Sequence, residues 1–450
     1  HNSSAILIRD GTILAGYEEE RFTGKKSDSS FSINSILELK TRYSLRPDTK
    51  FAVSHWFLDG KLPDENKYWS ESKIRELFPK TEILSLHNEF THHDSHLESA
   101  MVFAGNDFAD DYIAYVVDGF GTHGEHMTIY QYTKGKYELL DRYYGFNESL
   151  GLFYQYATAY LGMKMHQDEY KLLAYETKVT VLDEFKRLIE FIDDYSEGIC
   201  VKMIVYNGSK EFDLDELKSV QEQFNRRMDT VLRPFNFNED EKKIAVAYMA
   251  QRHIENVMIS VNAKYDPENL LVVGGLFYNV KLNHVLANEV SGKFCVMPLA
   301  GDQGAGLGVY QHYFKNLRWP NHLFWGDRDF DYDKLSKVPG IEVVDQNDML
   351  GRISSELNKS GWVNVIRGKM EYGPRALCNT STLALPNYEV SKMINKVNGR
   401  LDLMPFGLVV TKEQAKHLFV DINKVHKSLE YMIMVREMYR PCAEQFDAGY

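Results

Sequence analysis

The sequence predicts an α/β protein with more than one domain. Two strand–turn–strand units lie about a hundred residues apart, segments of helical periodicity follow them, and a fully apolar run occurs at residues 270–273. At 450 residues the chain is too long for one ordinary domain. Its hydrophobic residues, 44% of the total, are enough for large cores and give no sign of disorder.

The first strand–turn–strand unit predicts a hairpin within residues 5–17, with its turn at residues 10–11. The second unit runs from residue 112 to residue 132, with its turn after residue 117. Repetition of this unit indicates a duplicated α/β fold. The actin and hexokinase group has such a fold, with two ribonuclease H-like halves that close over a nucleotide.

Apolar residues at helical spacing predict helices over residues 149–175, 181–194, 213–232 and 240–264. The apolar run that follows is typical of a buried parallel strand, and Gly274 and Gly275 end it. A second glycine-rich segment, residues 301–308, opens the next helix.

Residues 315–345 are rich in Trp, Asn, Pro and Asp with little periodicity, and a new set of helix, strand and loop patterns begins at residue 348. We therefore divide the chain into a large domain over 1–318, a connector over 319–345 and a smaller domain over 346–450. The chain does not begin with Met and enters a strand almost at once, so we expect further residues upstream.

The charge balance limits the class of partner. Lys and Arg number 52 against 64 Asp and Glu, a net charge of −12, which argues against stable binding to duplex nucleic acid or an anionic membrane. No apolar run approaches the ~18 to 20 residues of a membrane span, and no signal peptide is visible. The four cysteines have no metal-binding spacing, so we expect a cytoplasmic protein without disulfides.

A cluster of histidines indicates a metal site. His92 and His96 are four residues apart, so on a helix both imidazoles lie on one face and can hold one divalent ion. Asp118 after a strand and Asp302 at a helix start can complete the ligand set. The alternatives are a polar helix face for the histidines, a turn aspartate at 118 and a helix cap at 302. His123 and His126 form a rival ligand pair in a glycine-bearing turn.

Two glycine-rich loops, Gly274 with Gly275 and residues 301–308, are candidates for phosphate contact, although neither matches a P-loop. A Gly-Pro turn presents Arg375 between apolar flanks, which suits a fixed guanidinium that contacts a phosphate. The alternative is an ion pair between Arg375 and Glu371.

Six segments in this order resemble the O-carbamoyltransferase family, whose known members carbamoylate antibiotics and nodulation factors. They are residues 1–5 with 19–22, 92–96, 149–154 through 169–172, 274–279, 301–304 and 370–377. The resemblance implies an actin-like ATPase-type N-terminal domain and a YrdC-like C-terminal domain. It also implies that the C-terminal domain makes carbamoyl adenylate from carbamoyl phosphate and ATP, and that the N-terminal domain transfers the carbamoyl group to an acceptor hydroxyl.

The resemblance assigns roles to individual residues. The family's metal, iron in known members with manganese and magnesium as alternatives, maps to His92, His96, Asp118 and Asp302. His1 is the expected base, Asp118 belongs to the catalytic set, and Lys171 contacts the adenylate or pairs with Glu169. The nucleotide and its phosphates are assigned to Asn279, Asn283, Arg367, Lys369, Arg375, Arg400 and the amides of Gly274, Gly275 and Gly304.

The chain departs from the family pattern in its smaller domain. Residues 378–381, Cys-Asn-Thr-Ser, lack an arginine of the family motif, and residues 398–406 lack a lysine and an arginine. About a hundred further residues with another nucleotide-binding segment are expected by the resemblance. Each lost cation weakens polyphosphate binding, so the adenylate-forming domain is expected to be incomplete.

We interpret the sequence as an ATP-dependent O-carbamoyltransferase that acts on a hydroxyl of a sugar, nucleoside or nucleotide. A hydroxymethylated pyrimidine nucleotide is one such small-molecule acceptor, and a homodimer is compatible with the sequence. Two alternatives stay open: an actin-fold kinase or ATPase, and a catalytically degenerate nucleotide-binding regulatory module, which the missing cations favour.

Overall fold

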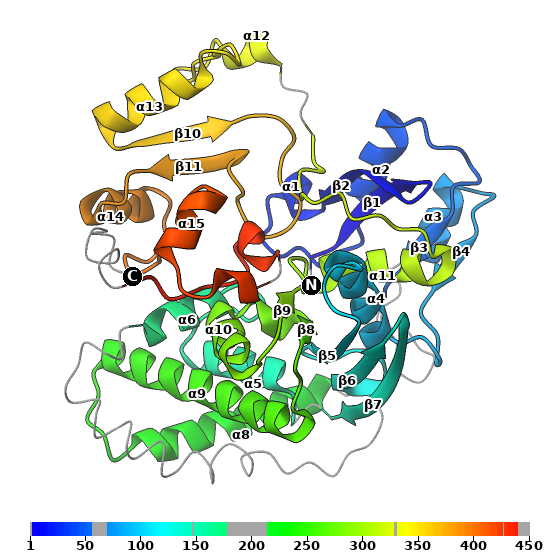
Figure 1. Ribbon diagram of the computed structural model, residues 1–450, viewed down its shortest axis with the longest axis vertical. Coiled ribbons are helices and arrows are strands. Elements are labelled where there is room, and N and C mark those ends of the chain that lie inside the picture. The colour runs from blue at the N-terminus through cyan, green and yellow to red at the C-terminus, as the bar shows by residue number, and fades with distance from the viewer. Residues whose placement is uncertain are drawn as a thin grey trace.

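The computed structural model describes residues 2–55, 70–145, 148–177, 214–327, 331–425 and 427–439, and shows a mixed α/β protein (Figure 1). His1 and the helix predicted over 181–194 lie outside the described residues. None of the described helices has the length and apolar character needed to cross a membrane.

The central sheet has five strands in the order β7-β6-β5-β8-β9. Strands β5, β6 and β7 pair antiparallel, whereas β5, β8 and β9 pair parallel. In chain order this is 3-2-1-4-5 with only the second strand reversed, which is the ribonuclease H-like arrangement of the actin and hexokinase fold. The strand bounds are β5 Asp111–Val117, β6 Glu125–Thr133, β7 Lys136–Tyr144, β8 Leu270–Val273 and β9 Phe294–Val296.

Helices cover both faces of this sheet, which explains the continuous apolar character of its central strands. All four residues of β8 are buried, as are six of the seven in β5. Helices α4 (His92–Ala104) and α11 (Asp302–Phe314) pack together on one side. Helices α5 (Leu150–Tyr160), α8 (Leu214–Leu232) and α9 (Glu239–Tyr265) lie on the other (Figure 1).

The first half of the duplicated fold is smaller. Strands β1 (Ser4–Arg9) and β2 (Thr12–Glu18) form the predicted hairpin, and β3 (Phe51–Val53) pairs parallel with β4 (Ile83–Ser85) in a separate sheet. Three helices accompany them: α1 Glu20–Thr23, α2 Ile33–Arg42 and α3 Glu71–Leu77.

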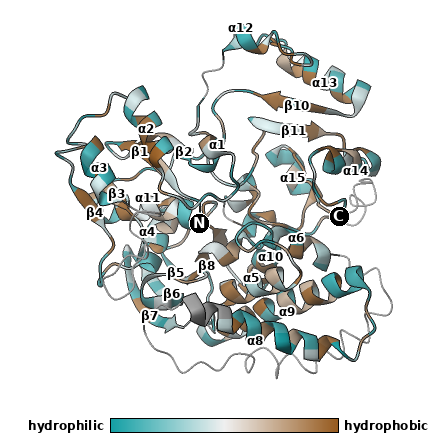
Figure 2. Cartoon of the chain, turned by 180° about the vertical axis from the view of Figure 1, so that it is seen from behind, coloured by the Kyte–Doolittle hydropathy of each residue, from teal (hydrophilic) through white to brown (hydrophobic). Residues whose placement is uncertain are grey.

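Two further helices of the large unit are α6 (Glu169–Glu176) and α10 (Val280–Glu289). In the smaller unit, β10 (Trp362–Ile366) pairs antiparallel with β11 (Thr380–Ala384). Its helices are α12 Tyr332–Leu335, α13 Met349–Ser360, α14 Tyr388–Val397 and α15 Lys412–Leu418. Figure 2 shows hydrophobic residues along β10 and mixed hydropathy along α13, which buries none of its side chains.

The end of the described chain returns to the large unit. Val425 forms a parallel bridge with Phe294 at the outer edge of β9, and the Ser428 hydroxyl accepts a 2.8 Å hydrogen bond from the amide of Val296. Ile433 is fully buried, and its carbonyl accepts a 2.8 Å bond from Asn283. This return covers an otherwise open sheet edge. The division of the chain at residue 346 stays a prediction, and it gave no indication of this return.

Candidate metal centre

The first turn of α4 fixes the two histidines. Thr91 caps the helix in a reciprocal capping box with Asp94, so the helix begins at His92. His92 and His96 then lie on one face, with exposed fractions of 2% and 0%. Their Nε2 atoms are 3.1 Å apart, which is close enough for both to bind one ion.

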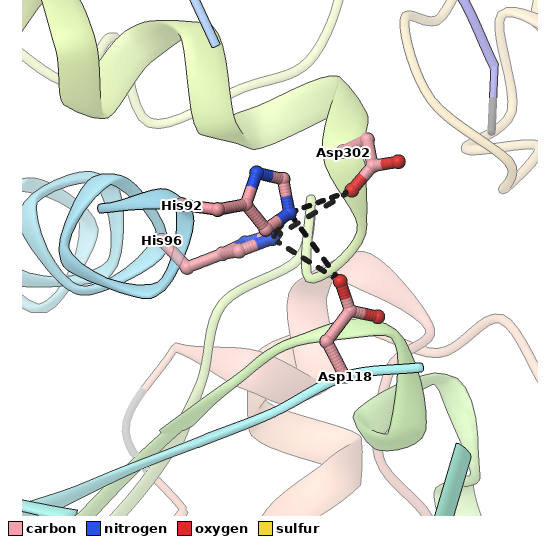
Figure 3. Close-up of side chains that lie close together, drawn as sticks. All are labelled: His92, His96, Asp118 and Asp302. Carbon is pink, nitrogen blue, oxygen red and sulfur yellow. Dashed lines mark hydrogen bonds and ion pairs between the residues drawn. The ribbon is translucent and has the colours of Figure 1, made fainter. Parts of the chain in front are cut away.

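The two predicted carboxylates meet these histidines (Figure 3). Asp118 follows the C-terminal end of β5, and Asp302 is the first residue of α11. His92 Nε2 lies 3.4 Å from Asp118 Oδ2 and 3.2 Å from Asp302 Oδ1, and His96 Nε2 lies 3.7 Å from each. One ligand atom from each residue falls within 4.8 Å of all the others.

Asp118 is held through its other oxygen. Its Oδ1 accepts hydrogen bonds from the amides of Gly119 at 2.8 Å and Gly275 at 3.2 Å, which leaves Oδ2 toward the histidines. A side chain at Gly275 would displace this carboxylate, because a Cβ would lie 2.7 Å from Asp118 Oδ1. The glycine therefore allows the loop after β8 to anchor a carboxylate.

The cluster attracts positive charge. Burial opposes a charge on His92, but the carboxylates of Asp118 and Asp302 raise its pKa to about 10. Burial likewise opposes ionisation of Asp118, yet hydrogen bonds from the two histidines hold its pKa well below its usual range. Two imidazole nitrogens and two carboxylate oxygens are suitable ligands for a divalent transition metal, which would take the place of the proton.

The rival ligand pair lies outside this group. The four-residue group that could hold an ion, within the described residues, contains neither His123 nor His126. His126 is buried, and burial lowers the pKa of its imidazole to about 4. Its two ring nitrogens have no hydrogen-bond partner among the described residues.

The glycine amides predicted to contact a phosphate are engaged inside the protein. The amide of Gly274 donates to the carbonyl of Ala300 at 2.9 Å, and that of Gly304 donates to the carbonyl of Gly301 at 3.0 Å. The amide of Gly275 donates to Asp118, as described above. These amides are therefore engaged inside the protein in this structure, and their contact with a phosphate stays a prediction.

The two predicted nucleotide-binding asparagines also have structural partners. Asn279 caps α10 by accepting from the amide of Leu282, and its Nδ2 donates to Gln251 at 2.7 Å. Asn283 is fully buried and donates to the carbonyls of Phe277 and Ile433. Their side-chain amides therefore hold loops together in this structure.

The predicted cations differ in their surroundings. Lys171 forms an ion pair with Asp168 at 2.8 Å, so its partner is not the expected Glu169. Lys369 donates to the carbonyl of Leu14 on β2 at 3.0 Å and so connects the two units. Arg367 donates to the carbonyl of Cys378, and Arg400 donates to the carbonyl of Pro405 and stacks on Phe406.

Arg375 is the exception among these cations. Its Nη2 donates to the carbonyl of Tyr278 at 3.4 Å, while its buried Nε has no partner among the described residues. Burial lowers the pKa of this guanidinium. Glu371 does not pair with it, because that carboxylate accepts from the amides of Leu377, Asn379 and Thr380. The side chain thus crosses from the smaller unit to the loop before α10.

Sequence reasoning missed two groups near the centre. His166 lies close enough for Asp302 and Asp118 to raise the pKa of its imidazole, although burial dominates and lowers it to about 4. Glu125 and Arg142 form buried contacts with the start of α4. A lone histidine and two charges on strands carry no spacing signal, so the sequence offered no means of finding them.

Comparison with known proteins identifies relatives over most of the chain. The family model described as Carbamoyltransferase N-terminus matches residues 54–310, and that described as Carbamoyltransferase C-terminus matches residues 354–449. An uncharacterised protein of Methanocaldococcus jannaschii is 25% identical to this chain, in an alignment that covers 90% of this chain and 76% of that protein.

Two relatives with descriptive names agree with the family match. Nodulation protein NolNO of Sinorhizobium fredii is 23% identical and covers 98% of this chain and 67% of its own length. The 3'-hydroxymethylcephem-O-carbamoyltransferase of Amycolatopsis lactamdurans is 29% identical and covers 47% of this chain and 40% of its own length. Because the first family model alone matches more than half of the chain, the chain belongs to the O-carbamoyltransferase family and is a transferase enzyme.

Proposed function

We propose that this protein is an ATP-dependent O-carbamoyltransferase that uses carbamoyl phosphate and passes the carbamoyl group from carbamoyl adenylate to a hydroxyl of a small molecule. The observation that supports this proposal best is the convergence of His92, His96, Asp118 and Asp302 at one point in a chain of this family. An acceptor of the size of a sugar, nucleoside or nucleotide suits the acidic chain better than a nucleic-acid polymer does.

We propose that the four residues hold iron, with manganese or magnesium as the alternatives. Bound there, the metal would supply a Lewis acid that stabilises negative charge on an oxygen of the adenylate. His92 and His96 would bind through Nε2, and Asp118 through Oδ2, because its Oδ1 is occupied by two amides. The chain's own contribution is to fix these atoms and to exclude water by burial.

The transfer step requires a base. The acceptor oxygen forms a bond with the carbamoyl carbon, the bond from that carbon to the AMP phosphate oxygen breaks, and the hydroxyl proton passes to the base. We keep His1 as the proposed base on the family resemblance, with Asp118 and Lys171 in the catalytic set. A well-placed base accelerates such a reaction by roughly 10² to 10⁴.

Arg375 supports the binding of an anion between the units. Arg375 is half-buried, its buried Nε has no hydrogen-bond partner among the described residues, and a guanidinium in such a place is unfavourable unless a negatively charged ligand neutralises it. A phosphate of ATP, carbamoyl phosphate or the adenylate would do so. We propose that Arg375 binds this phosphate and that Arg367, Lys369 and Arg400 contribute to the same nucleotide site.

The test is to incubate the protein with ATP, labelled carbamoyl phosphate and candidate hydroxyl acceptors, including a hydroxymethylated pyrimidine nucleotide. Release of AMP and pyrophosphate together with a carbamoylated acceptor is the expected result. Release of ADP would instead indicate a kinase, and absence of turnover would indicate a regulatory nucleotide-binding module. Asp302→Ala should abolish transfer and lower the bound metal, and unchanged metal content would contradict the assignment of Asp302.

A further inference from the structure

The histidines of the metal centre lack the usual support for their rings. A metal-bound histidine normally donates its second ring N–H to a carboxylate, carbonyl or water. His92 Nδ1 and His96 Nδ1 are both buried, and neither has a hydrogen-bond partner among the described residues. The described contacts that bear on the orientation of the two rings are those that place the helix carrying them.

The backbone at the start of α4 is held from the neighbouring strand. The amide of His93 donates to Glu125 Oε1 at 2.9 Å, and the Thr91 hydroxyl lies 3.0 Å from Glu125 Oε2. Glu125 is the first residue of β6 and has an exposed fraction of 0%. Its carboxylate therefore attaches the first turn of the helix to the central sheet.

A second carboxylate makes the same connection from the helix side. Asp94 Oδ2 accepts from the amide of Thr91 at 2.8 Å, and its Oδ1 accepts from the hydroxyl of Tyr130 on β6 at 2.5 Å. Asp94 has an exposed fraction of 7%. The capping carboxylate is thus itself bound to the sheet.

One cation joins the two carboxylates. Arg142 on β7 donates from Nη2 to Asp94 Oδ1 at 2.8 Å, and its Nε lies 3.4 Å from Glu125 Oε2. Its side chain is only 12% exposed. In the part of the chain that the structure describes, no other cation forms an ion pair with Asp94 or Glu125.

We propose that Arg142 is a positioning residue for the metal centre: by holding Asp94 and Glu125 together, it fixes the first turn of α4 and so aims His92 and His96 at Asp118. Asp118 directly follows β5, the strand that pairs with β6, so the first turn of α4 is attached to the same sheet that positions this carboxylate. This inference rests on the metal centre proposed above. It adds Arg142, Asp94 and Glu125, which are not among the four candidate metal ligands.

The experiment is a titration of metal-free protein with Co²⁺, whose visible absorption reports the coordination geometry. Arg142→Lys keeps the charge but replaces the planar guanidinium, which bonds Asp94 through Nη2 and approaches Glu125 through Nε, with a single ammonium group. We expect its affinity for Co²⁺ to fall by about 10- to 100-fold, with a changed visible spectrum. Arg142→Met also removes the charge, so its affinity for Co²⁺ should fall further than that of Arg142→Lys. Thermal unfolding shows whether each variant is folded.

The matched control is Lys315→Met. Lys315, at the end of α11, forms an ion pair at 3.0 Å with Glu98, which lies on α4 after the two histidines. Removing Lys315 therefore takes an ion pair from α4 without changing the contacts of its first turn. Its affinity and spectrum should equal those of the wild type. Wild-type affinity and spectrum in folded Arg142→Lys, or equal loss in Lys315→Met, would overturn the inference while leaving the metal centre intact. Failure of the wild type to bind Co²⁺ would overturn both.

Discussion

At the scale of single residues, Arg375 forms no ion pair with any carboxylate that the structure describes. Burial lowers the pKa of its guanidinium, and its only hydrogen bond to a described residue is to the carbonyl of Tyr278. Such a group destabilises the fold and is retained where a ligand neutralises it. If Arg375 binds a phosphate as proposed, the same side chain lowers the stability of the ligand-free fold and raises the affinity for the ligand.

Arg375→Met is expected to raise the free energy of unfolding of the ligand-free protein by about 1 kcal/mol or more, because an unpaired buried charge is removed. The same change should abolish the increase in Tm that AMP or ATP produces in the wild type. Thermal unfolding with and without nucleotide measures both effects. Arg352→Met is the control, because Arg352 is an exposed partner of Glu342 and should affect neither quantity by more than about 0.5 kcal/mol. A destabilised Arg375→Met that still responds to nucleotide would contradict the assignment.

His253 predicts how stability depends on pH. It is 8% exposed on α9, its ring lies 4.4 Å from that of Phe153, and burial lowers the pKa of its imidazole to about 4. The unfolded state therefore binds a proton that the folded state does not between about pH 6.5 and pH 4, so stability falls as the pH falls through this range.

The size of this effect follows from the pKa difference. A gap of about 2.5 units corresponds to about 3 kcal/mol of stability lost between pH 6.5 and pH 4. His253→Phe should reduce the slope by this contribution, because phenylalanine does not titrate, while the buried His126 and His166, whose pKa values are also lowered to about 4, keep the rest of it. Urea unfolding at several pH values measures the dependence of stability on pH. His87→Phe, at an exposed position, is the control. An unchanged slope in His253→Phe would show that His253 is not kept neutral by burial.

At the scale of elements, the metal centre depends on how closely α11 approaches α4. A Cβ on Gly308 would lie 1.7 Å from the carbonyl oxygen of Ser95, between the two histidines in sequence. The backbones of the two helices therefore touch at this point. Only glycine permits this contact, which sets the distance from Asp302 to the histidines.

Gly308→Ala is expected to push α11 away from α4, to lower stability by about 1 to 3 kcal/mol through overpacking, and to weaken metal binding. Gly306→Ala lies on the same helix, with its nearest neighbour 4.0 Å from the added Cβ. It should stabilise the protein by about 0.5 to 1 kcal/mol and leave metal binding unchanged. Denaturant unfolding measures the stability of the two variants, and metal titration measures their affinity for the metal. Equal behaviour of the two would contradict the role of the helix contact.

Elements whose sequence pattern is local could be predicted, whereas features that depend on contacts between distant segments could not. The hairpins, the helices predicted over 213–232 and 240–264 and the strand β8 have local periodicity, and the structure confirms them. The helix predicted over 149–175 is two helices, α5 and α6, and the helix predicted over 181–194 lies outside the described residues. The strand order of the sheet was not visible in the sequence, because pairing of β5 with β8 joins segments far apart in the chain. The role of Arg142 was also hidden, since it depends on which residues face each other across the sheet.

At the scale of the whole molecule, the sequence located the four candidate metal ligands because each lies at a recognisable point: a helix face, a strand end or a helix start. The sequence did not indicate the internal partners of the Gly274 and Gly275 amides, because these partners, Ala300 and Asp118, lie far away in the chain. The domain division, the bound metal and the residues of the nucleotide site stay predictions. The return of the chain to β9 had no signal at all.

The return of residues 425–434 predicts that the two units do not unfold independently. Ile433 has an exposed fraction of 0% and packs in the same core as the central sheet, although it lies far beyond the predicted connector. Ile433→Ala should lower the free energy of unfolding of this core by about 2 to 5 kcal/mol, because a cavity forms among residues that cannot collapse around it. Val397→Ala, on an α14 side chain that is 73% exposed, should change it by less than about 0.5 kcal/mol. Hydrogen exchange at the amides of β8 measures the stability of the core directly. Unchanged protection there in Ile433→Ala would show that the returning segment is bound to the sheet without stabilising it.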